Sequence, residues 1–246
     1  KHEAEPKAKR PCSRYIPTST PSTKRCKVAD EDKDCEVVAV HRPAAPRYEW
    51  SDYRYYPVDE AWQRQACALL GMHFVRPFQR QDGGSDMILT RPDMRSLRSI
   101  GGDGNCLFRA LCYIISGSET QHGELRRAIV AHMRTIPFLV SGTGPDGNRN
   151  YLVTYDDGYS SVEDYLEKSN MAENGVWGGD FEMCLLAHML DTPIYSYQAD
   201  SNYWLCCFPH AIDRRVPENV NVHSLYTFLR RNHFQVVTAV RRRLTS

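Results

Sequence analysis

Apolar residues recur every three to four positions in five stretches between residues 57 and 190. This spacing places the apolar side chains on one face of a helix, so the pattern predicts five amphipathic helices. Their apolar stripes are formed by Val58, Trp62, Ala66 and Leu69; by Leu107, Leu111 and Ile114; by Leu125, Ile129 and Met133; by Val162, Tyr165 and Leu166; and by Phe181, Leu185 and Met189.

Capping residues mark where several of these helices begin and end. Pro57 suits the first position of the first helix, and Gly71 suits its end. The second helix is predicted over residues 106–116. Ser161 and Asp164 form a capping-box pattern in front of the fourth helix.

Beyond residue 192 the apolar period shortens toward two, which is typical of strands. The predicted strands are Pro193–Tyr197, Tyr203–Phe208, Leu225–Leu229 and His233–Val240. Helices therefore come first and strands later. This order favours an α+β layout over alternating βαβ units.

The first 47 residues differ in composition from the rest of the chain. They hold six prolines, 11 basic and 7 acidic residues, and one aromatic residue, Tyr15. Such a segment cannot bury enough apolar surface to offset the entropy lost on ordering. We therefore predict a disordered, basic, proline-rich tail over residues 1–47, a folded domain over 48–240 and a short basic tail over 241–246.

The whole composition, with 41% hydrophobic and 25% charged residues, is that of a soluble globular protein. No apolar run is long enough to span a membrane, and the first ten residues contain no secretory signal. A net charge of +1 argues against a uniformly basic nucleic-acid binder. The basic clusters of the tail resemble a bipartite nuclear-import signal, and their residues are Lys7, Lys9, Arg10, Lys24, Arg25 and Lys27. No aromatic residues are interleaved with these charges, which disfavours nucleic acid as a partner.

The nine cysteines are odd in number and form no CxxC pair. This argues against a disulfide framework and for a reducing compartment, the cytosol or the nucleus. Structural zinc sites need paired Cys or His ligands at short spacing. Cys206, Cys207 and His210 come nearest to that pattern but have no second half, so we expect no metal.

One stretch combines groups that suit covalent catalysis: residues 101–111, GGDGNCLFRAL. Its glycines allow positive φ and close approach to a ligand, and they end in a thiol, Cys106, at the start of a predicted helix. Free amides at a helix start favour a thiolate over a thiol, and they can bind the oxyanion that forms when a thiolate attacks a carbonyl. The plainer interpretation of a free cysteine is a buried apolar residue, but this context favours a nucleophile.

A nucleophilic cysteine also needs a base, and His233 is the best candidate. It opens an apolar strand directly after the polar turn Arg230-Arg231-Asn232. No other histidine begins a predicted strand behind a polar turn. A strand start would hold the ring rigidly at the edge of a cleft.

Three blocks of the chain resemble the OTU (ovarian tumour) family of cysteine proteases, a group of deubiquitinases. Residues 102–110, GDGNCLFRA, resemble the family's nucleophile motif. Residues 177–179, WGG, followed by Glu182, resemble its central helix entry. Residues 232–234, NHF, resemble its terminal histidine block.

The resemblance spans residues 95–240, with 48–94 as a variable N-terminal extension of the same domain. It implies a papain-like α+β fold of the OTU type, with a central, mostly antiparallel sheet flanked by helices. It also implies that no cofactor or metal is needed.

The resemblance assigns roles to several residues. It implies Cys106 as nucleophile, His233 as general base and then general acid, and Asp103 as a residue that shapes the oxyanion loop or completes a triad. It places Gly104 and Asn105 in that loop. The substrate cleft is expected to include Trp177, Gly178 and Phe234.

The third catalytic residue departs from the family pattern. Many members have Asp or Asn two positions after the histidine, where this chain has Gln235. A strand returns that side chain to the same face as His233, so its amide oxygen could accept from the ring without supplying a charge. Asp103, Gln235 and Asn232 therefore remain candidates, and Asp103 is preferred as the only ionisable one.

The function implied is a thiol-dependent deubiquitinase. It would hydrolyse isopeptide or peptide bonds after the C-terminal glycine of ubiquitin, polyubiquitin or a ubiquitin-like modifier, through a Cys106 thioester. One alternative is an OTU-fold ubiquitin-binding module with weak or no turnover, which Gln235 favours. Another is a viral or mobile-element protease that processes a polyprotein.

Overall fold

The computed structural model describes residues 53–81, 87–135, 159, 161–209 and 222–241. The chain divides into two units, Lys1–Tyr48 and Glu49–Ser246, and every described residue belongs to the second. The predicted tail over 1–47 and all but the first residue of the tail over 241–246 lie outside the described residues.

Helices form in all five predicted stretches. They are α1 (Glu60–Leu70), α2 (Cys106–Ser116), α3 (His122–Thr135), α4 (Val162–Ser169) and α5 (Asp180–Leu190). The bounds predicted for α2 are confirmed. The predicted stripe of α3 is also confirmed, because its three side chains are fully buried.

Two predictions about the first helix are wrong. Helix α1 begins three residues after Pro57, because the side chain of Asp59 accepts a hydrogen bond from the Trp62 amide and caps the helix there. Pro57 instead forms an isolated β-bridge with Ser224. Leu69, expected on the buried face, is 65% exposed. The predicted end of the helix is confirmed, since Gly71 caps it with a φ of +66°.

A five-stranded sheet forms the centre of the domain. Its order is β3 (Leu97–Arg98), β7 (His233–Val237), β6 (Leu225–Arg230), β4 (Ile194–Gln198) and β5 (Tyr203–Cys207). Only β4 and β6 pair in parallel, so the expected α+β fold with a mostly antiparallel sheet flanked by helices is confirmed. Strands β1 (Arg54–Tyr55) and β2 (Met87–Ile88) form a separate antiparallel pair, and a short 3-10 turn, η2 (Met94–Ser96), precedes β3.

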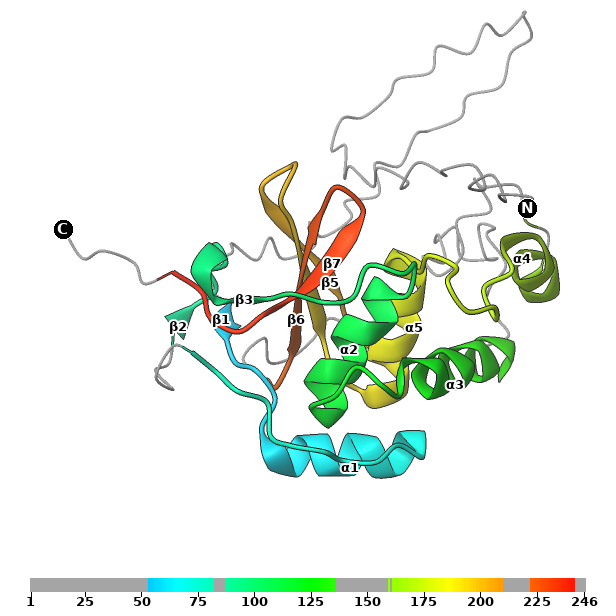
Figure 1. The fold of residues 1–246 in the computed structure, drawn as a ribbon, viewed down its shortest axis with the longest axis horizontal. Coiled ribbons are helices and arrows are strands. Elements are labelled where there is room, and N and C mark those ends of the chain that lie inside the picture. Colours follow the sequence, from blue (N-terminus) through cyan, green and yellow to red (C-terminus); the bar gives the residue numbers. More distant parts are fainter. Residues whose placement is uncertain (1–52, 82–86, 136–158, 160, 210–221, 242–246) are drawn as a thin grey trace, which may run out of the picture. The chain divides into compact units, whose positions relative to one another are not determined.

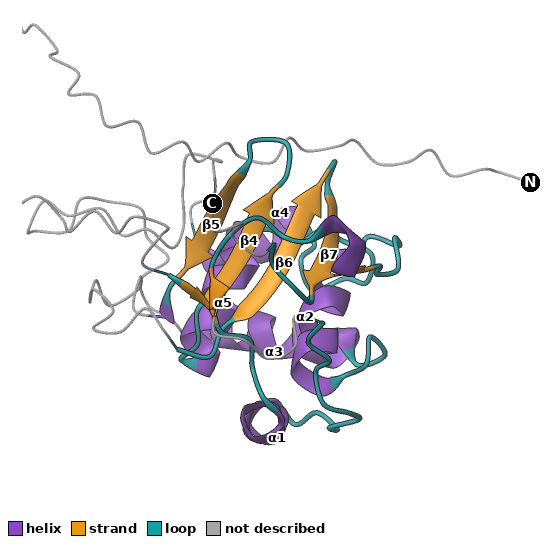
Figure 2. Cartoon of the chain, turned by 90° about the vertical axis from the view of Figure 1, so that its left-hand side faces the viewer, coloured by secondary structure: helices purple, strands orange, loops and turns teal. Residues whose placement is uncertain are grey.

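The two faces of the sheet are covered differently. Helices α2, α3 and α5 lie on one face (Figure 2). On the other face an aromatic cluster joins strand residues to the N-terminal segment of the domain. Its largest members are Tyr53, Tyr55, Tyr195, Tyr197, Trp204, Tyr226 and Phe228. The segment that carries β1 therefore belongs to the core of the domain.

Helix α2 is the central helix of the apolar core. Phe108, Leu111 and Cys112 are fully buried. The helix packs on β7, whose Phe234 and Val236 belong to the same core cluster. Figure 1 shows the course of α2 beside the sheet. A helix that is apolar on all sides needs neighbours on all sides, and α1 and α3 supply them. This packing fixes the position of the first residue of α2, Cys106.

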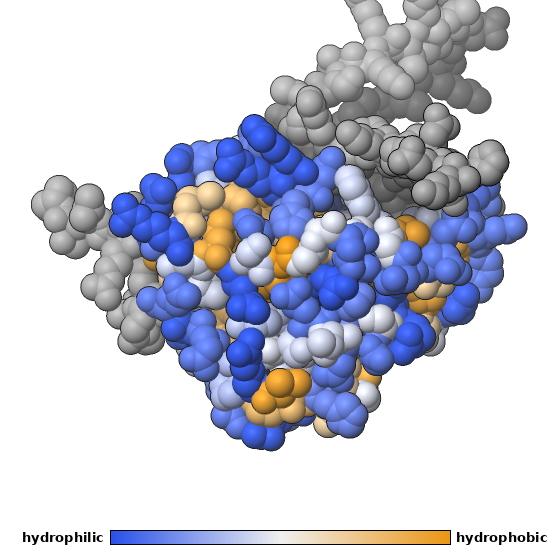
Figure 3. All heavy atoms as spheres, viewed as in Figure 1, coloured by the Kyte–Doolittle hydropathy of each residue, from blue (hydrophilic) through white to orange (hydrophobic). Residues whose placement is uncertain are grey.

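The surface drawn in Figure 3 is mostly hydrophilic, with hydrophobic residues in small separate patches. None of the described helices is long and apolar enough to cross a membrane.

Candidate active site

Cys106 is the first residue of α2, as predicted, and is 8% exposed. Its Sγ lies 4.0 Å from the carbonyl oxygen of Asn232, a long contact even for sulfur. Asn232 directly precedes His233. The thiol therefore lies beside the turn that carries the predicted base.

A tight hairpin turn places His233 at the start of β7. The turn consists of Arg231 and Asn232, which have φ values of +48° and +64° between the paired residues Arg230 and His233. Positive φ at both central residues is what a type I′ hairpin requires. Because the turn is only two residues long, the histidine stands at the tip of the hairpin, next to Asn232.

The ring of His233 lies against the glycine turn before α2. A Cβ on Gly102 would lie 3.7 Å from Cε1 and 3.9 Å from Nδ1 of His233. Gly102 of the glycine turn thus lies against His233 of the hairpin, and Cys106 lies against Asn232. Among the described residues, no hydrogen bond joins the Cys106 thiol to the His233 ring; the thiol instead contacts the neighbouring residue, Asn232. Catalytic hydrogen bonds are often long without substrate.

Asp103 faces Arg109 in this structure. The Arg109 guanidinium donates from Nε at 3.0 Å and from Nη2 at 2.5 Å to the two carboxylate oxygens, and the Asn105 amide donates to Oδ1 at 3.1 Å. These bonds, led by those from Arg109, hold the pKa of Asp103 well below its usual range. The carboxylate is therefore ionised and holds the turn, and within the described residues it makes no bond to His233.

The free amides of the turn define where an oxyanion can bind. The Asn105 amide donates to Asp103 Oδ1, so this N–H is not free in the structure, and the place of Gly104 and Asn105 in the oxyanion loop stays a prediction. Within the described part of the chain, the amides of Asp103, Gly104 and Cys106 donate to no protein acceptor. These three N–H groups are the candidates.

Gly104 is required by a close approach of two backbone segments. Its φ is +84°, and a Cβ there would overlap the carbonyl group of Gly175, lying 2.7 Å from the carbonyl carbon. The Gly175 amide in turn donates to Asn105 Oδ1 at 2.8 Å. The glycine turn is therefore bound to the segment between α4 and α5.

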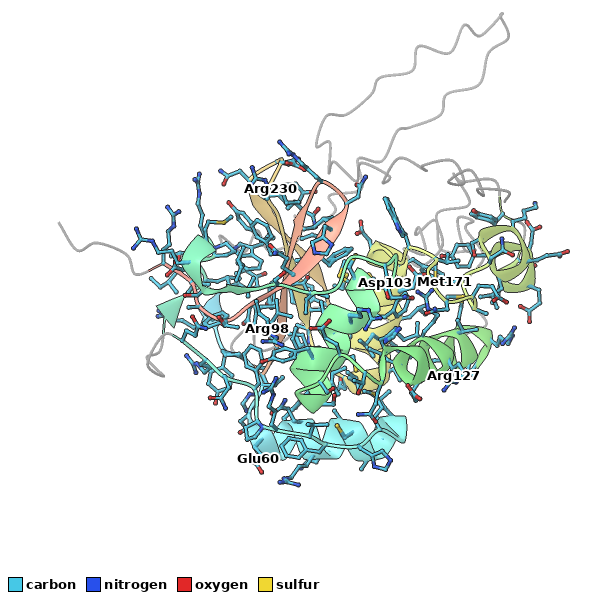
Figure 4. All side chains as sticks on the ribbon, viewed as in Figure 1. Glu60, Arg98, Asp103, Arg127, Met171 and Arg230 are labelled. Atoms are coloured by element: carbon cyan, nitrogen blue, oxygen red, sulfur yellow. The ribbon has the colours of Figure 1, made fainter. Side chains whose placement is uncertain are left out.

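Arg126 of α3 is part of this site, and the sequence reasoning missed it. It is 2% exposed, and its Nη2 donates to Asn105 Oδ1 at 2.8 Å (Figure 4 labels its neighbours Asp103, Arg127 and Met171). A signal was present in the sequence. Position 126 lies three and four residues from other buried positions, Ile129 and Val130, so a charged side chain interrupts the apolar face of the helix.

The block Trp177-Gly178-Gly179 leads into α5 and lies against the start of α2. A Cβ on Gly178 would lie 2.8 Å from Phe108 Cε2 and 2.9 Å from Leu107 Cδ2, so this glycine packs flat on the first turn of α2. Trp177 is 49% exposed. Its place in a substrate cleft stays a prediction, supported by this exposure.

Glu182 fixes the geometry of that helix entry through two hydrogen bonds. Its carboxylate accepts from the Gly179 amide at 2.7 Å and from the Tyr165 hydroxyl at 2.6 Å. The side chain is 1% exposed, and burial raises its pKa. The motif thus caps α5 and fixes the Trp177 segment.

Phe234 does not line a cleft, and that expectation was wrong. It is 4% exposed and packs into the core beneath α2, because alternate residues of β7 face opposite sides of the sheet. Gln235 is half-buried two residues after His233, opposite Phe228 of β6. Among the described residues, neither Gln235 nor the side chain of Asn232 forms a hydrogen bond with His233.

A thiol at a helix N-terminus, beside a histidine at the start of a strand, is the arrangement found in cysteine proteases. The chain belongs to the family of OTU-like cysteine proteases, because the model of that family matches residues 101–233, more than half of the chain.

Two curated relatives each match less than half of the chain. Deubiquitinase OTUD6B of Xenopus laevis is 29% identical over 113 residues, which cover 43% of this chain and 34% of the relative. OTU domain-containing protein 6A of Mus musculus is 30% identical over 107 residues, again 43% and 34%. This chain thus spans about a third of these relatives' length. Among solved structures, the OTUD1 OTU domain is 20% identical with a TM-score of 0.40, over 57% of this chain and 83% of that one.

Proposed function

We propose that the chain is a thiol-dependent deubiquitinase, which hydrolyses isopeptide or peptide bonds after the C-terminal glycine of ubiquitin or a ubiquitin-like modifier. The observation that carries the proposal is the contact of Cys106 Sγ with Asn232, the residue preceding His233, at the end of a glycine turn in which the amides of Asp103, Gly104 and Cys106 donate to no described acceptor. Family membership and the name of the Xenopus relative support ubiquitin as the modifier.

The geometry suits a two-step acyl transfer. The thiolate of Cys106 attacks the carbonyl of the modifier's C-terminal glycine, and amides of Asp103, Gly104 and Cys106 stabilise the oxyanion. His233 gives its proton to the departing lysine amine, which leaves as the C–N bond breaks. Water, deprotonated by His233, then attacks the thioester. The modifier's carboxylate leaves, and the thiol is restored.

A ubiquitin-binding module without turnover is the second candidate, and one observation favours it. The ring of His233 forms no hydrogen bond with any described residue, and Asp103 is engaged by Arg109. A ring without an orienting acceptor is a weaker base, although the loss of the orienting residue reduces turnover and does not abolish it.

Hydrolysis of ubiquitin 7-amido-4-methylcoumarin separates the two candidates. A deubiquitinase releases the fluorophore over many turnovers, and Cys106→Ala removes that activity while leaving the melting temperature unchanged. Cys184→Ala, which removes a half-buried thiol of α5, is the control and retains activity. Binding of ubiquitin with no release by the wild type would support the non-catalytic module.

A further inference from the structure

Arg126 is a buried cation without an ion pair. Its side chain, 2% exposed, has no carboxylate within 4.0 Å among the described residues. Burying a charge costs free energy unless other groups compensate, so a buried arginine at this place needs a reason. The partners of Arg126 suggest that reason, because nearly all of them belong to the glycine turn before α2, to the first turn of α2 or to the segment bound to the glycine turn.

The guanidinium joins three parts of the chain. Nη2 donates to Asn105 Oδ1 at 2.8 Å and to the carbonyl of Val176 at 2.7 Å, and Nη1 donates to the carbonyl of Met171 at 2.9 Å. Its Cζ lies 3.8 Å from the ring centroid of Phe108, two residues after the nucleophile. The arginine thus contacts the residue before Cys106, the first turn of α2 and both ends of the segment 171–176.

We propose that Arg126 is a positioning residue for the reaction: it holds Asn105 in place and so fixes the amides that bind the oxyanion. The inference rests on the proposed function, from which it takes the Cys106 nucleophile and the oxyanion-binding amides. Asn105 is the N-cap residue of α2, and it lies between the free amides of Gly104 and Cys106. Its side chain has no capping bond to the helix, because Oδ1 is held by Arg126 and Gly175 instead.

Only an arginine can make this set of bonds. Its planar fork donates in fixed directions to three acceptors and stacks on an aromatic face, whereas lysine has a single flexible ammonium group. With lysine at 126 the positive charge stays, but at least one of the three acceptors loses its donor. Asn105 can then turn away, and the amides on either side of it move with it.

The test compares Arg126→Lys with Arg127→Lys, a control on the same helix whose side chain is 70% exposed. Turnover is measured on ubiquitin 7-amido-4-methylcoumarin and on p-nitrophenyl acetate, a small ester that needs the nucleophile and the oxyanion site but no ubiquitin. Alkylation of Cys106 by iodoacetamide is measured alongside, with Cys106→Ala as background. Alkylation needs the thiolate and forms no oxyanion.

For Arg126→Lys we expect kcat to fall about 10- to 100-fold on both substrates, less than the loss of a whole oxyanion donor, with KM changed less than about threefold. Alkylation should stay within about threefold of wild type, because the thiol and helix α2 are unchanged. Arg127→Lys should match wild type. Unchanged kcat in Arg126→Lys overturns the inference, and so does a parallel fall of kcat and alkylation, since that marks a general structural role.

Two further outcomes are distinguishable. If the wild type hydrolyses only the ester, the proposed function fails, and Arg126→Lys on the ester still decides the inference. If the wild type acts on neither substrate, both fail. Should Arg126→Lys not fold, Asn105→Ala removes the acceptor at the other end. The inference requires that Asn105→Ala lowers kcat and leaves the alkylation rate of Cys106 unchanged. If Asn105→Ala retains both kcat and the alkylation rate, the inference is overturned.

Discussion

Replacing Gly104 by alanine tests whether the shape of the glycine turn is needed for catalysis. The residue has a φ of +84°, which costs an L-residue about 1–2 kcal/mol. The added Cβ would also overlap the Gly175 carbonyl, so the two segments must separate. Separation breaks the part-buried bond from the Gly175 amide to Asn105 Oδ1, and leaving such polar groups without their partner costs about 1–3 kcal/mol. Together these terms amount to about 2–5 kcal/mol.

Gly71 provides the matched control. Its φ is +66°, but a Cβ there meets nothing within 4 Å. Gly71→Ala therefore carries the backbone strain alone, about 1–2 kcal/mol, which lowers the melting temperature by about 2–8 °C in a domain of this size. Its turnover should equal that of the wild type, because Gly71 ends α1, away from the site.

The assay is turnover of ubiquitin 7-amido-4-methylcoumarin, with calorimetric melting of each variant. We expect Gly104→Ala to lower kcat at least about 100-fold, because displacing the turn misplaces oxyanion donors that are each worth about 10²–10³ in kcat. Turnover of Gly104→Ala within threefold of wild type would refute the reasoning, since it would show that the close approach to Gly175 has no part in catalysis.

Four further predictions follow from the same structure. Asp103→Ala should lower kcat more than Gln235→Ala does, because it releases Arg109 and the Asn105 amide, and steady-state rates of the two variants compare them. Gln235→Asp should equal or exceed wild-type kcat, since it adds a carboxylate on the face of β7 that carries His233; a large loss would contradict this. Because the pKa of Asp103 is lowered on folding, the stability it contributes is complete above the ordinary aspartate value of about 3.9 and is lost as pH falls through its folded value. The melting-temperature difference between wild type and Asp103→Asn should therefore be constant from pH 8 to 5 and shrink below about pH 4. Deleting residues 1–47 should leave both melting temperature and kcat unchanged, and a large drop in either would place the domain boundary elsewhere.

The elements that the sequence predicted well are those with long, regular apolar patterns. Helix α2 and strands β4 to β7 have enough residues for a period to be recognised, and their bounds were found within a few residues. Strands β1, β2 and β3 have two residues each, too few to show any alternation. Their pairing depends on partners far along the chain, which a local pattern does not contain.

The candidate site likewise contains residues that local sequence signals indicate and contacts that the sequence does not indicate. Cys106 and His233 could be singled out as candidates because each stands at the boundary of an element, where local signals such as glycines and a polar turn are strong. The contacts of Arg126 and the pairing of Asp103 with Arg109 arise from tertiary packing between elements. The family resemblance placed Phe234 in the substrate cleft, whereas strand alternation turns its side chain into the core.

The most direct test of the central claim is to locate the covalent bond between the chain and ubiquitin. The protein is incubated with ubiquitin that carries a C-terminal propargylamide, which reacts with a thiol placed next to the bound C-terminus. The adduct is then digested and mapped by mass spectrometry. The account predicts one adduct, on the peptide that contains Cys106, and none with Cys106→Ala. Absence of an adduct in the wild type, or an adduct on another cysteine, would contradict the account.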